Sequence, residues 1–142
     1  MIRGLLADVN VAGHLAYLNR LLHQLDLVEV MASGSPFRFV TFRELGLANT
    51  LPDRQVWHYC QLEGWILLTD NRNHDDADSL AAVIGDSWQD GHLPVLTIAN
   101  KDRFEHDLHY AAVVARDAAD IIYGLLHTEE NRDQPRIFVP RK

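Results

Sequence analysis

Three short apolar segments of this chain each run into an acidic residue, and this pattern limits the possible folds more than any other feature of the sequence. The acids are Asp8, Glu44 and Asp70. In an open α/β sheet, ligands bind outside the carboxyl ends of parallel strands, so three such acids would meet at one edge. Carboxylates that lie close together repel each other unless they share a proton or a cation. The pattern therefore predicts a divalent-cation site and points towards phosphodiester chemistry.

Strand and helix patterns alternate along the 142 residues, a length that suits a single domain spanning residues 1–142. Strands are predicted at residues 2–7, 37–42, 65–69 and 93–98, with a fifth, edge strand at 136–139. Apolar residues that recur every three or four positions predict helices at residues 11–25, 53–63, 79–84 and 101–126. This alternation predicts the α/β class, with a parallel sheet covered on both faces.

The composition narrows the class of protein. The net charge of −7 and the pI near 5.5 argue against a surface dominated by non-specific nucleic-acid binding, which is usually basic. A nuclease remains compatible, because acids that hold a metal lower the net charge. Cys60 is the one cysteine, so no internal disulfide can form and a reducing compartment fits. The N-terminus lacks the pattern of a signal peptide and no apolar run reaches the length of a membrane span, so we predict a cytoplasmic protein.

Each of the leading acids also has an ordinary structural explanation. Asp8 and Asp70 directly follow apolar strands, and for these two we favour metal binding over helix capping and turn formation. Glu44 follows the second strand and can equally form a surface ion pair with Arg43. Asp53 competes with Glu44 for the same role, but a first-turn position, where the helix dipole favours an acid, explains it better.

The remaining polar clusters are weaker candidates. The segment 74–78 carries three acids that could complete a metal shell, yet charged loops are usually solvated and Asp78 is placed to cap a helix. None of the eight histidines has convincing metal-ligand spacing, and His106 and His109 have no third ligand nearby. Cys60 lies on the apolar side of its helix and is predicted to be a core residue.

The three strand ends also carry a family resemblance. The segments LLADVN, VTFRELGLANTLPDRQVW and GWILLTDNRN follow one another in the correct order within residues 5–73, about half of the chain. They resemble the small PIN-like proteins, which run roughly as LADENV, V-x-x-REL-GL-x-x-x-x-D-x-x-(apolar) and G-x-(apolar)-LLT-x-D-x-D. The downstream half agrees in element order only. The resemblance implies a three-layer α/β/α PIN-like fold around a mainly parallel sheet of four to five strands.

The resemblance also implies an activity, because PIN-like proteins include Mg- or Mn-dependent ribonucleases. Many of these are toxins held by an antitoxin partner, and small members are commonly dimers. The first-strand acid of the family falls on Asp8, and the acid after the second strand falls on Glu44 or Asp53. The two aspartates of the family's T-x-D-x-D motif are asparagines here, Asn71 and Asn73.

Asp70 stands one position before that motif's first aspartate, and Val9 stands where the family commonly has a glutamate. Three acids are therefore the predicted metal-binding and catalytic residues: Asp8, Glu44 and Asp70. Three neighbours are predicted to bind the substrate: Arg43, Asn71 and Arg72. The metal would lower the pKa of a bound water and orient the phosphate, and the arginines would neutralise charge on the phosphate oxygens.

Two functions stay open on these grounds. The first is a metal-dependent ribonuclease acting on RNA, a candidate toxin of a toxin–antitoxin pair. The second is a catalytically impaired PIN-like module that binds a protein or RNA partner, because an asparagine carbonyl can ligate Mg but brings no charge. A phosphoacceptor receiver domain also has an acid after its first strand but needs a lysine after its last. The only lysines are Lys101 and Lys142, so we set this class aside.

Overall fold

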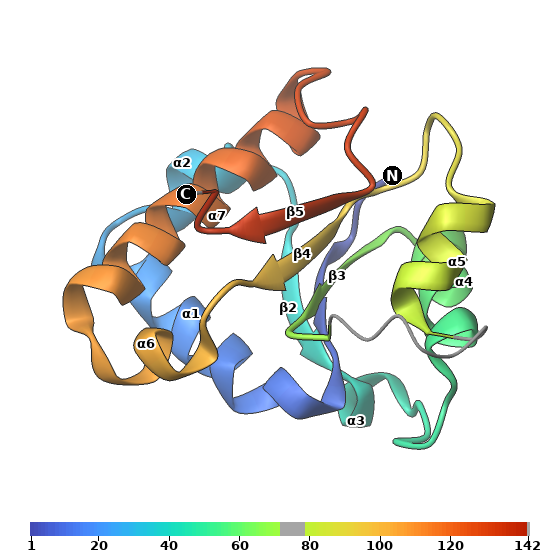
Figure 1. Cartoon of the computed structure of the whole chain (residues 1–142). Helices are drawn as coiled ribbons and strands as arrows, with labels where there is room; N and C mark the ends of the chain where they lie inside the picture. The colour runs from blue at the N-terminus through green and yellow to red at the C-terminus, as the bar shows by residue number, and fades with distance from the viewer. Residues whose placement is uncertain (72–78, 142) are drawn as a thin grey trace.

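The computed structural model describes residues 1–71 and 79–141, and its strands form one parallel sheet. In chain order the strands are β1 (Gly4–Ala7), β2 (Arg38–Thr41), β3 (Trp65–Thr69), β4 (Val95–Ile98) and β5 (Arg136–Val139). Their order across the sheet is β2-β1-β3-β4-β5, and every neighbouring pair is parallel (Figure 1). The predicted α/β class and parallel sheet are confirmed, and so are all five predicted strand positions, to within about two residues at each end.

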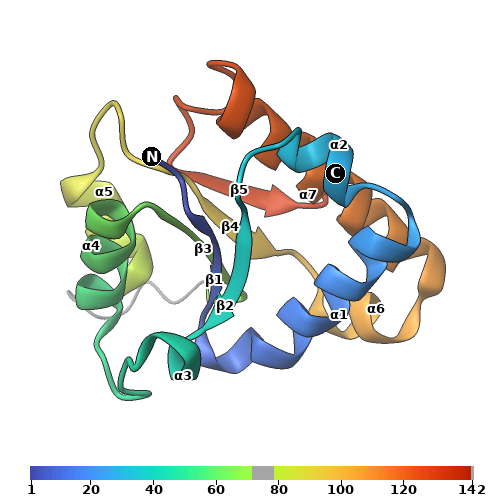
Figure 2. The same cartoon turned by 180° about the vertical axis from the view of Figure 1, so that it is seen from behind.

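Helices cover both faces of this sheet, which gives the three layers seen in Figures 1 and 2. One face carries α1 (Ala12–Gln24), α2 (Val28–Ala32), α6 (Lys101–His106) and α7 (Leu108–His127). The other face carries α4 (Asp53–Glu63) and α5 (Leu80–Ser87). Two short elements follow the carboxyl ends of β1 and β2, namely the 3-10 helix η1 (Val9–Val11) and α3 (Phe42–Leu45).

The position of each strand in the sheet explains its sequence. Every residue of β1, β3 and β4 is buried, because these inner strands have helices on both sides. Consecutive residues of β1 enter opposite cores: Leu5 packs with α1 and α7, and Leu6 packs with α4 and α5. Strands that are buried on both faces have continuous apolar sequences, whereas strands with one solvated face alternate between apolar and polar residues. The edge strands differ, and Phe138 of β5 keeps 40% of its surface exposed.

The sequence prediction is wrong at the end of the second strand. Phe42 was predicted to lie in the strand, but it begins α3. The Thr41 side chain accepts a hydrogen bond from the Glu44 backbone N–H, and the Glu44 side chain accepts one from the Thr41 backbone. This reciprocal capping box starts a helix where the apolar pattern alone suggested more strand.

The long C-terminal helix is also interrupted, which the sequence prediction missed. Asp107 ends α6 and caps α7 by accepting a hydrogen bond from the backbone N–H of Tyr110. The break turns Leu108 outwards, and this apolar residue inside the predicted helix is 79% exposed. Beyond the break the helix continues as predicted, and its residues Ala111 and Ala115 are fully buried.

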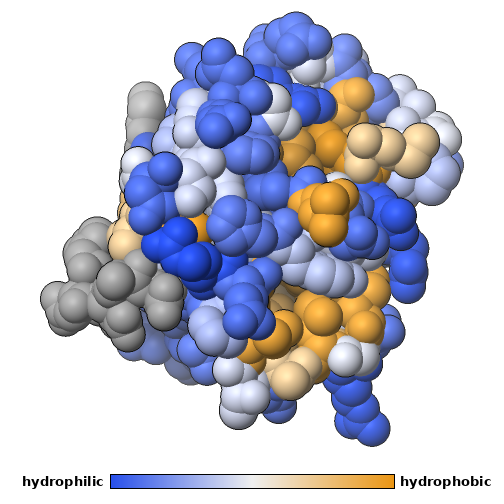
Figure 3. Space-filling view, turned by 90° about the vertical axis from the view of Figure 1, so that its right-hand side faces the viewer, coloured by the Kyte–Doolittle hydropathy of each residue, from blue (hydrophilic) through white to orange (hydrophobic). Residues whose placement is uncertain are grey.

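The face formed by α4 and α5 is mostly hydrophilic, with separate apolar areas between the polar side chains (Figure 3). The apolar sides of α4 and α5 face the core of the protein. Trp57 and Cys60 of α4 are buried there, which is the position predicted for Cys60. Burial raises the pKa of the Cys60 thiol to about 12, so this cysteine is a packing residue. None of the described helices is both long and apolar enough to cross a membrane.

Candidate functional site

The strand order of the sheet changes direction between β1 and β3, and the carboxyl ends of these two strands therefore lie at a topological switch point. The chain leaves β1 for β2 on one side, and β3 returns to pair with β1 on the other. Ligands of open parallel sheets bind at such switch points. Asp8 and Asp70 follow these two strands, and the backbone N–H of Asp8 donates to the Leu68 carbonyl over 2.9 Å. The structure therefore brings two of the predicted acids to the same end of the sheet.

A cleft of about 150 Å³ opens at this switch point. Its polar lining combines two carboxylates with three amides: Asp8, Asp53, Asn10, Asn49 and Asn71. Apolar residues of η1, α3, β3, α4 and α5, with Leu51 of the loop before α4, form the rest of the wall. The cleft is small and its polar lining consists of carboxylate and amide side chains, which suits a hydrated cation or one phosphate group better than a large organic ligand.

Asp8 is held in place by the last residue of β3. The Thr69 hydroxyl donates to the Asp8 carboxylate over 2.9 Å and accepts from the backbone N–H of Asn71 over 3.0 Å. Thr69 is fully buried, so this link is shielded from water. It fixes the direction in which the Asp8 carboxylate faces the cleft.

The environment of Asp8 disfavours an unpaired negative charge on its carboxylate. Burial is the main cause that raises the pKa of the Asp8 carboxyl above its ordinary value, and hydrogen bonds from Thr69 and the Val9 backbone oppose it. The nearby charges of Asp53 and Asp70 raise this pKa further. A proton or a cation would relieve the same repulsion.

Asp53 reaches the cleft from the first turn of α4. One of its carboxylate oxygens accepts from the Asn71 side-chain amide over 2.8 Å and from the Leu80 backbone N–H over 3.2 Å. The carboxylate therefore ties the end of β3 and the start of α5 to α4. The first-turn placement predicted from the sequence is confirmed, and the bridge to Asn71 is an additional role.

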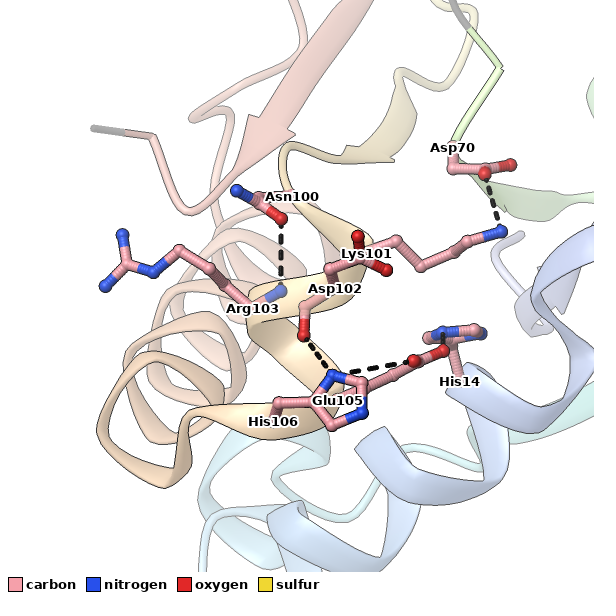
Figure 4. A network of polar contacts seen from close by, with 8 residues as sticks. All are labelled: His14, Asp70, Asn100, Lys101, Asp102, Arg103, Glu105 and His106. Atoms are coloured by element: carbon pink, nitrogen blue, oxygen red, sulfur yellow. Dashed lines mark hydrogen bonds and ion pairs between the residues drawn. The ribbon is translucent and has the colours of Figure 1, made fainter.

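Asp70 takes part in a different contact. Its carboxylate lies 3.0 Å from the Lys101 ammonium of α6, and Figure 4 shows the lysine side chain extended towards it. The hydrogen bond from this ammonium to Asp70 raises the pKa of Lys101. The same short helix is joined to α1 by a 2.5 Å contact between His14 and Glu105 (Figure 4). Asp70 is thus neutralised on the α6 side, and it is not among the residues that line the cleft.

The other predicted site residues fall outside the cleft lining. The Glu44 side chain accepts hydrogen bonds from the backbone N–H and the hydroxyl of Thr41, so its carboxylate serves the start of α3. Arg43 lies on the same helix and is exposed. Arg72 and Asn73, with the acidic segment 74–78, lie outside the described residues. Of the predicted substrate contacts, Asn71 lines the cleft.

Sequence reasoning missed Arg136, which it treated only as the start of an edge strand. The Arg136 guanidinium donates to the Asn71 carbonyl and to the fully buried Thr97 hydroxyl, both over 2.8 Å. It therefore joins β5 and β4 to the backbone that follows β3. The available signal was a single arginine in an otherwise apolar strand, which is uncommon unless its charge is engaged.

The described residues contain few ligands for a metal. Within residues 1–71 and 79–141, no group of three or more His, Cys, Asp or Glu side chains is arranged to hold a metal ion. Mg²⁺, however, is commonly bound through one or two carboxylates and keeps several waters. Asp8 and Asp53, with the amide oxygens of the cleft, fit that type of site.

No protein-family model, curated protein or solved structure matches the chain. The function proposed below therefore depends on the geometry of the cleft and on the sequence resemblance.

Proposed function

We propose that this protein is a PIN-like nuclease that cleaves RNA with Mg²⁺ or Mn²⁺ held by Asp8 and Asp53. One observation supports this most directly: the two carboxylates line a single polar cleft at the switch point of a parallel sheet. Ligands bind in this position in open α/β folds. Asp53 replaces Glu44 in the proposed ligand set, because Glu44 is engaged in the cap of α3.

The polar residues in and beside the cleft have separate tasks in this proposal. When bound, a cation would supply Lewis acidity and activate a water for hydrolysis of a phosphodiester. Asp8 and Asp53 would hold the cation, and Thr69 positions Asp8. The amides of Asn10 and Asn49 orient water and phosphate oxygens. Asp70 serves as a further carboxylate once Lys101 moves to the phosphate, where its ammonium stabilises negative charge.

The other expectations extend this proposal and rest on the sequence. RNA as substrate, an antitoxin partner and a homodimer follow from the family resemblance. Phosphate binding by Arg43 and Arg72 follows from their places beside the second and third strands. A cytoplasmic location is proposed because a single cysteine fits a reducing compartment.

A specific observation also favours the second candidate, a PIN-like module without catalytic activity. Asn71 stands where the family has an aspartate, and its amide already donates to Asp53. Lys101 likewise neutralises Asp70. Two carboxylates that could bind a cation, Asp53 and Asp70, are therefore already paired with protein groups.

Ribonuclease assays on the purified chain separate the two candidates. Wild type, Asp8→Asn and Asp90→Asn would be incubated with mixed single-stranded RNA in Mn²⁺, Mg²⁺ or EDTA. Asp90 is an exposed acid, so Asp90→Asn is the matched control for the loss of one carboxylate. We expect slow cleavage, faster in Mn²⁺ than in Mg²⁺, in wild type and Asp90→Asn.

Cleavage should be lost in EDTA and reduced at least a hundredfold in Asp8→Asn, which is about 2.7 kcal/mol of barrier. Equal cleavage by Asp8→Asn would contradict a role for this cleft. Absence of cleavage in wild type, together with retained binding of the same RNA, would instead support the non-catalytic module.

A further inference from the structure

A second cavity lies at the opposite end of the sheet, where β1 and β2 begin. It has a volume of about 500 Å³, within the range of small-molecule sites. Its lining comes from the residues before β1, the connection into β2, the end of α7 and the connection into β5. These segments meet near the N-terminus in Figure 1. The cavity shares no lining residue with the cleft at Asp8.

Three of the residues that line this cavity are arginines and none is acidic: Arg3, Arg38 and Arg132. The lining of this cavity is therefore positively charged, although the chain as a whole carries a net charge of −7. The ion pair between Arg3 and Glu63 is long, at 3.9 Å, and both side chains are more than a third exposed. Arg38 is exposed and lies over the ring of Trp65 at 5.9 Å.

Arg132 is the arginine that is anchored most firmly in the wall of the cavity. One end of its guanidinium donates to the Leu125 carbonyl over 2.8 Å, which fixes the side chain in the wall of the cavity. Its Nε is buried and has no hydrogen-bond partner among the described residues. This Nε is shielded from the cavity by the surrounding protein. The Leu125 carbonyl is uncharged, so Arg132 keeps its positive charge at the wall of the cavity.

The remainder of the lining is mainly apolar. It includes Ile2, Leu125 and Leu126, which belong to or pack against the core on the α1–α7 face. A purely ionic ligand would leave this surface in contact with water. A ligand with both an anionic head and an aliphatic portion would cover the apolar surface and reach the arginines.

We propose that this cavity binds a small amphiphilic anion, with a carboxylate or phosphate head among the three arginines and a short aliphatic tail against Ile2 and Leu126. Guanidinium groups recognise both kinds of head through paired hydrogen bonds. This binding is independent of the nuclease proposal, because it uses neither the acids nor the cation of the cleft.

Titration calorimetry on the full chain tests the site with defined probes. Octanoate and octyl phosphate carry the two heads, acetate and inorganic phosphate provide the heads alone, and octanol provides the tail alone. We expect at least one of the two amphiphiles to bind at least tenfold more tightly than its own head alone and than octanol. The better of the two identifies the head. Raising NaCl from 50 to 500 mM should weaken this binding, since the charges of the rim are exposed.

Substitutions then locate the binding. Arg3→Gln combined with Arg38→Gln removes two exposed charges of the cavity and should weaken the better probe at least tenfold. Ser35→Glu places a carboxylate in the lining and should have the same effect. Arg20→Gln is the matched control, because Arg20 is an exposed arginine of α1 outside this cavity, and it should leave affinity unchanged. Thermal melting of each variant verifies that the fold is retained.

Three results would overturn the proposal. They are no binding of either amphiphile, equal binding of octanol and the better amphiphile, or equal binding of that amphiphile by wild type, the double arginine variant and Ser35→Glu. RNA cleavage and Mn²⁺ binding at the cleft do not enter any of these readouts, so failure here leaves the proposed function intact, and the converse holds.

Discussion

The side-chain amide of Asn71 donates a 2.8 Å hydrogen bond to the carboxylate of Asp53, and so connects the end of β3 to the first turn of α4. The two residues are far apart in the sequence but share one wall of the candidate cleft. The neutral side-chain amide of Asn71 can donate this hydrogen bond, whereas an ionised aspartate at the same position could not. At the proposed metal site, we expect this contact to favour folding stability over cation affinity.

Replacing Asn71 by aspartate should reverse that balance. Asn71→Asp would place two carboxylates where one hydrogen bond now lies, so we expect the metal-free protein to lose about 1–3 kcal/mol of unfolding free energy. Its stabilisation by Mn²⁺ should exceed that of wild type, and ribonuclease activity should rise. Asn71→Ala is the control, because it also loses the hydrogen bond but adds no charge. If Mn²⁺ stabilised both variants equally, the cleft would not be the cation site.

Asp8→Asn should stabilise the metal-free protein at neutral pH. Because burial raises the pKa of Asp8 in the folded state, folding favours the protonated form, and stability is lost as pH rises through the folded pKa. An asparagine amide oxygen can still accept from Thr69 and carries no charge. We expect a higher melting midpoint than wild type at pH 7 in EDTA, and a smaller difference near pH 3.5. A lower midpoint at pH 7 would show that the Asp8 charge is stabilising instead.

Divalent cations should stabilise the folded protein by mass action. At free Mn²⁺ of one hundred times the dissociation constant, the gain is about 2.7 kcal/mol. In a chain of this size that corresponds to roughly 5–10 °C in the melting midpoint. Asp8→Asn and Asp53→Asn should remove most of this gain, whereas Asp90→Asn should keep it. A wild-type melting midpoint that does not respond to millimolar Mn²⁺ would exclude a strong cation site.

Lys101 should compete with a cation for Asp70. Lys101→Met removes the ammonium that lies 3.0 Å from this carboxylate, so Mn²⁺ affinity should rise about three- to tenfold. The cost in stability should stay below about 1 kcal/mol, because the pair is partly exposed. Lys101→Arg retains the charge and should behave as wild type. Unchanged Mn²⁺ affinity in Lys101→Met would remove Asp70 from the site.

Arg136 should position the backbone that follows β3. Arg136→Met loses the hydrogen bonds to the Asn71 carbonyl and the Thr97 hydroxyl, and the destabilisation should be about 1–3 kcal/mol in chemical denaturation. Arg43→Met is the control, and at this exposed site the change should be within about 0.5 kcal/mol. Similar values for the two variants would show that Arg136 contributes no more than a surface arginine.

The sequence was sufficient for the architecture because each inner strand is buried on both faces. Residues 65–68 of β3, for example, are apolar throughout, and such runs separated by helical periodicity predict a parallel sheet. The prediction failed where short polar contacts compete with periodicity. The Thr41–Glu44 capping box begins α3 inside a predicted strand, and the Asp107 cap divides a predicted helix into two.

The sequence by itself also predicted that Asp8 and Asp70 lie at one end of the sheet, because both directly follow strands of a parallel sheet. That these two strands are neighbours is a finding of the structure. Only the tertiary structure decided which acids share the cleft. Asp53 enters from α4 and accepts from Asn71, Asp70 turns to Lys101, and Glu44 stays at the cap of its own helix. Sequence patterns report burial and local hydrogen bonding along the chain. The direction of a charged side chain is set by partners from distant segments, which only the folded chain brings within hydrogen-bond distance.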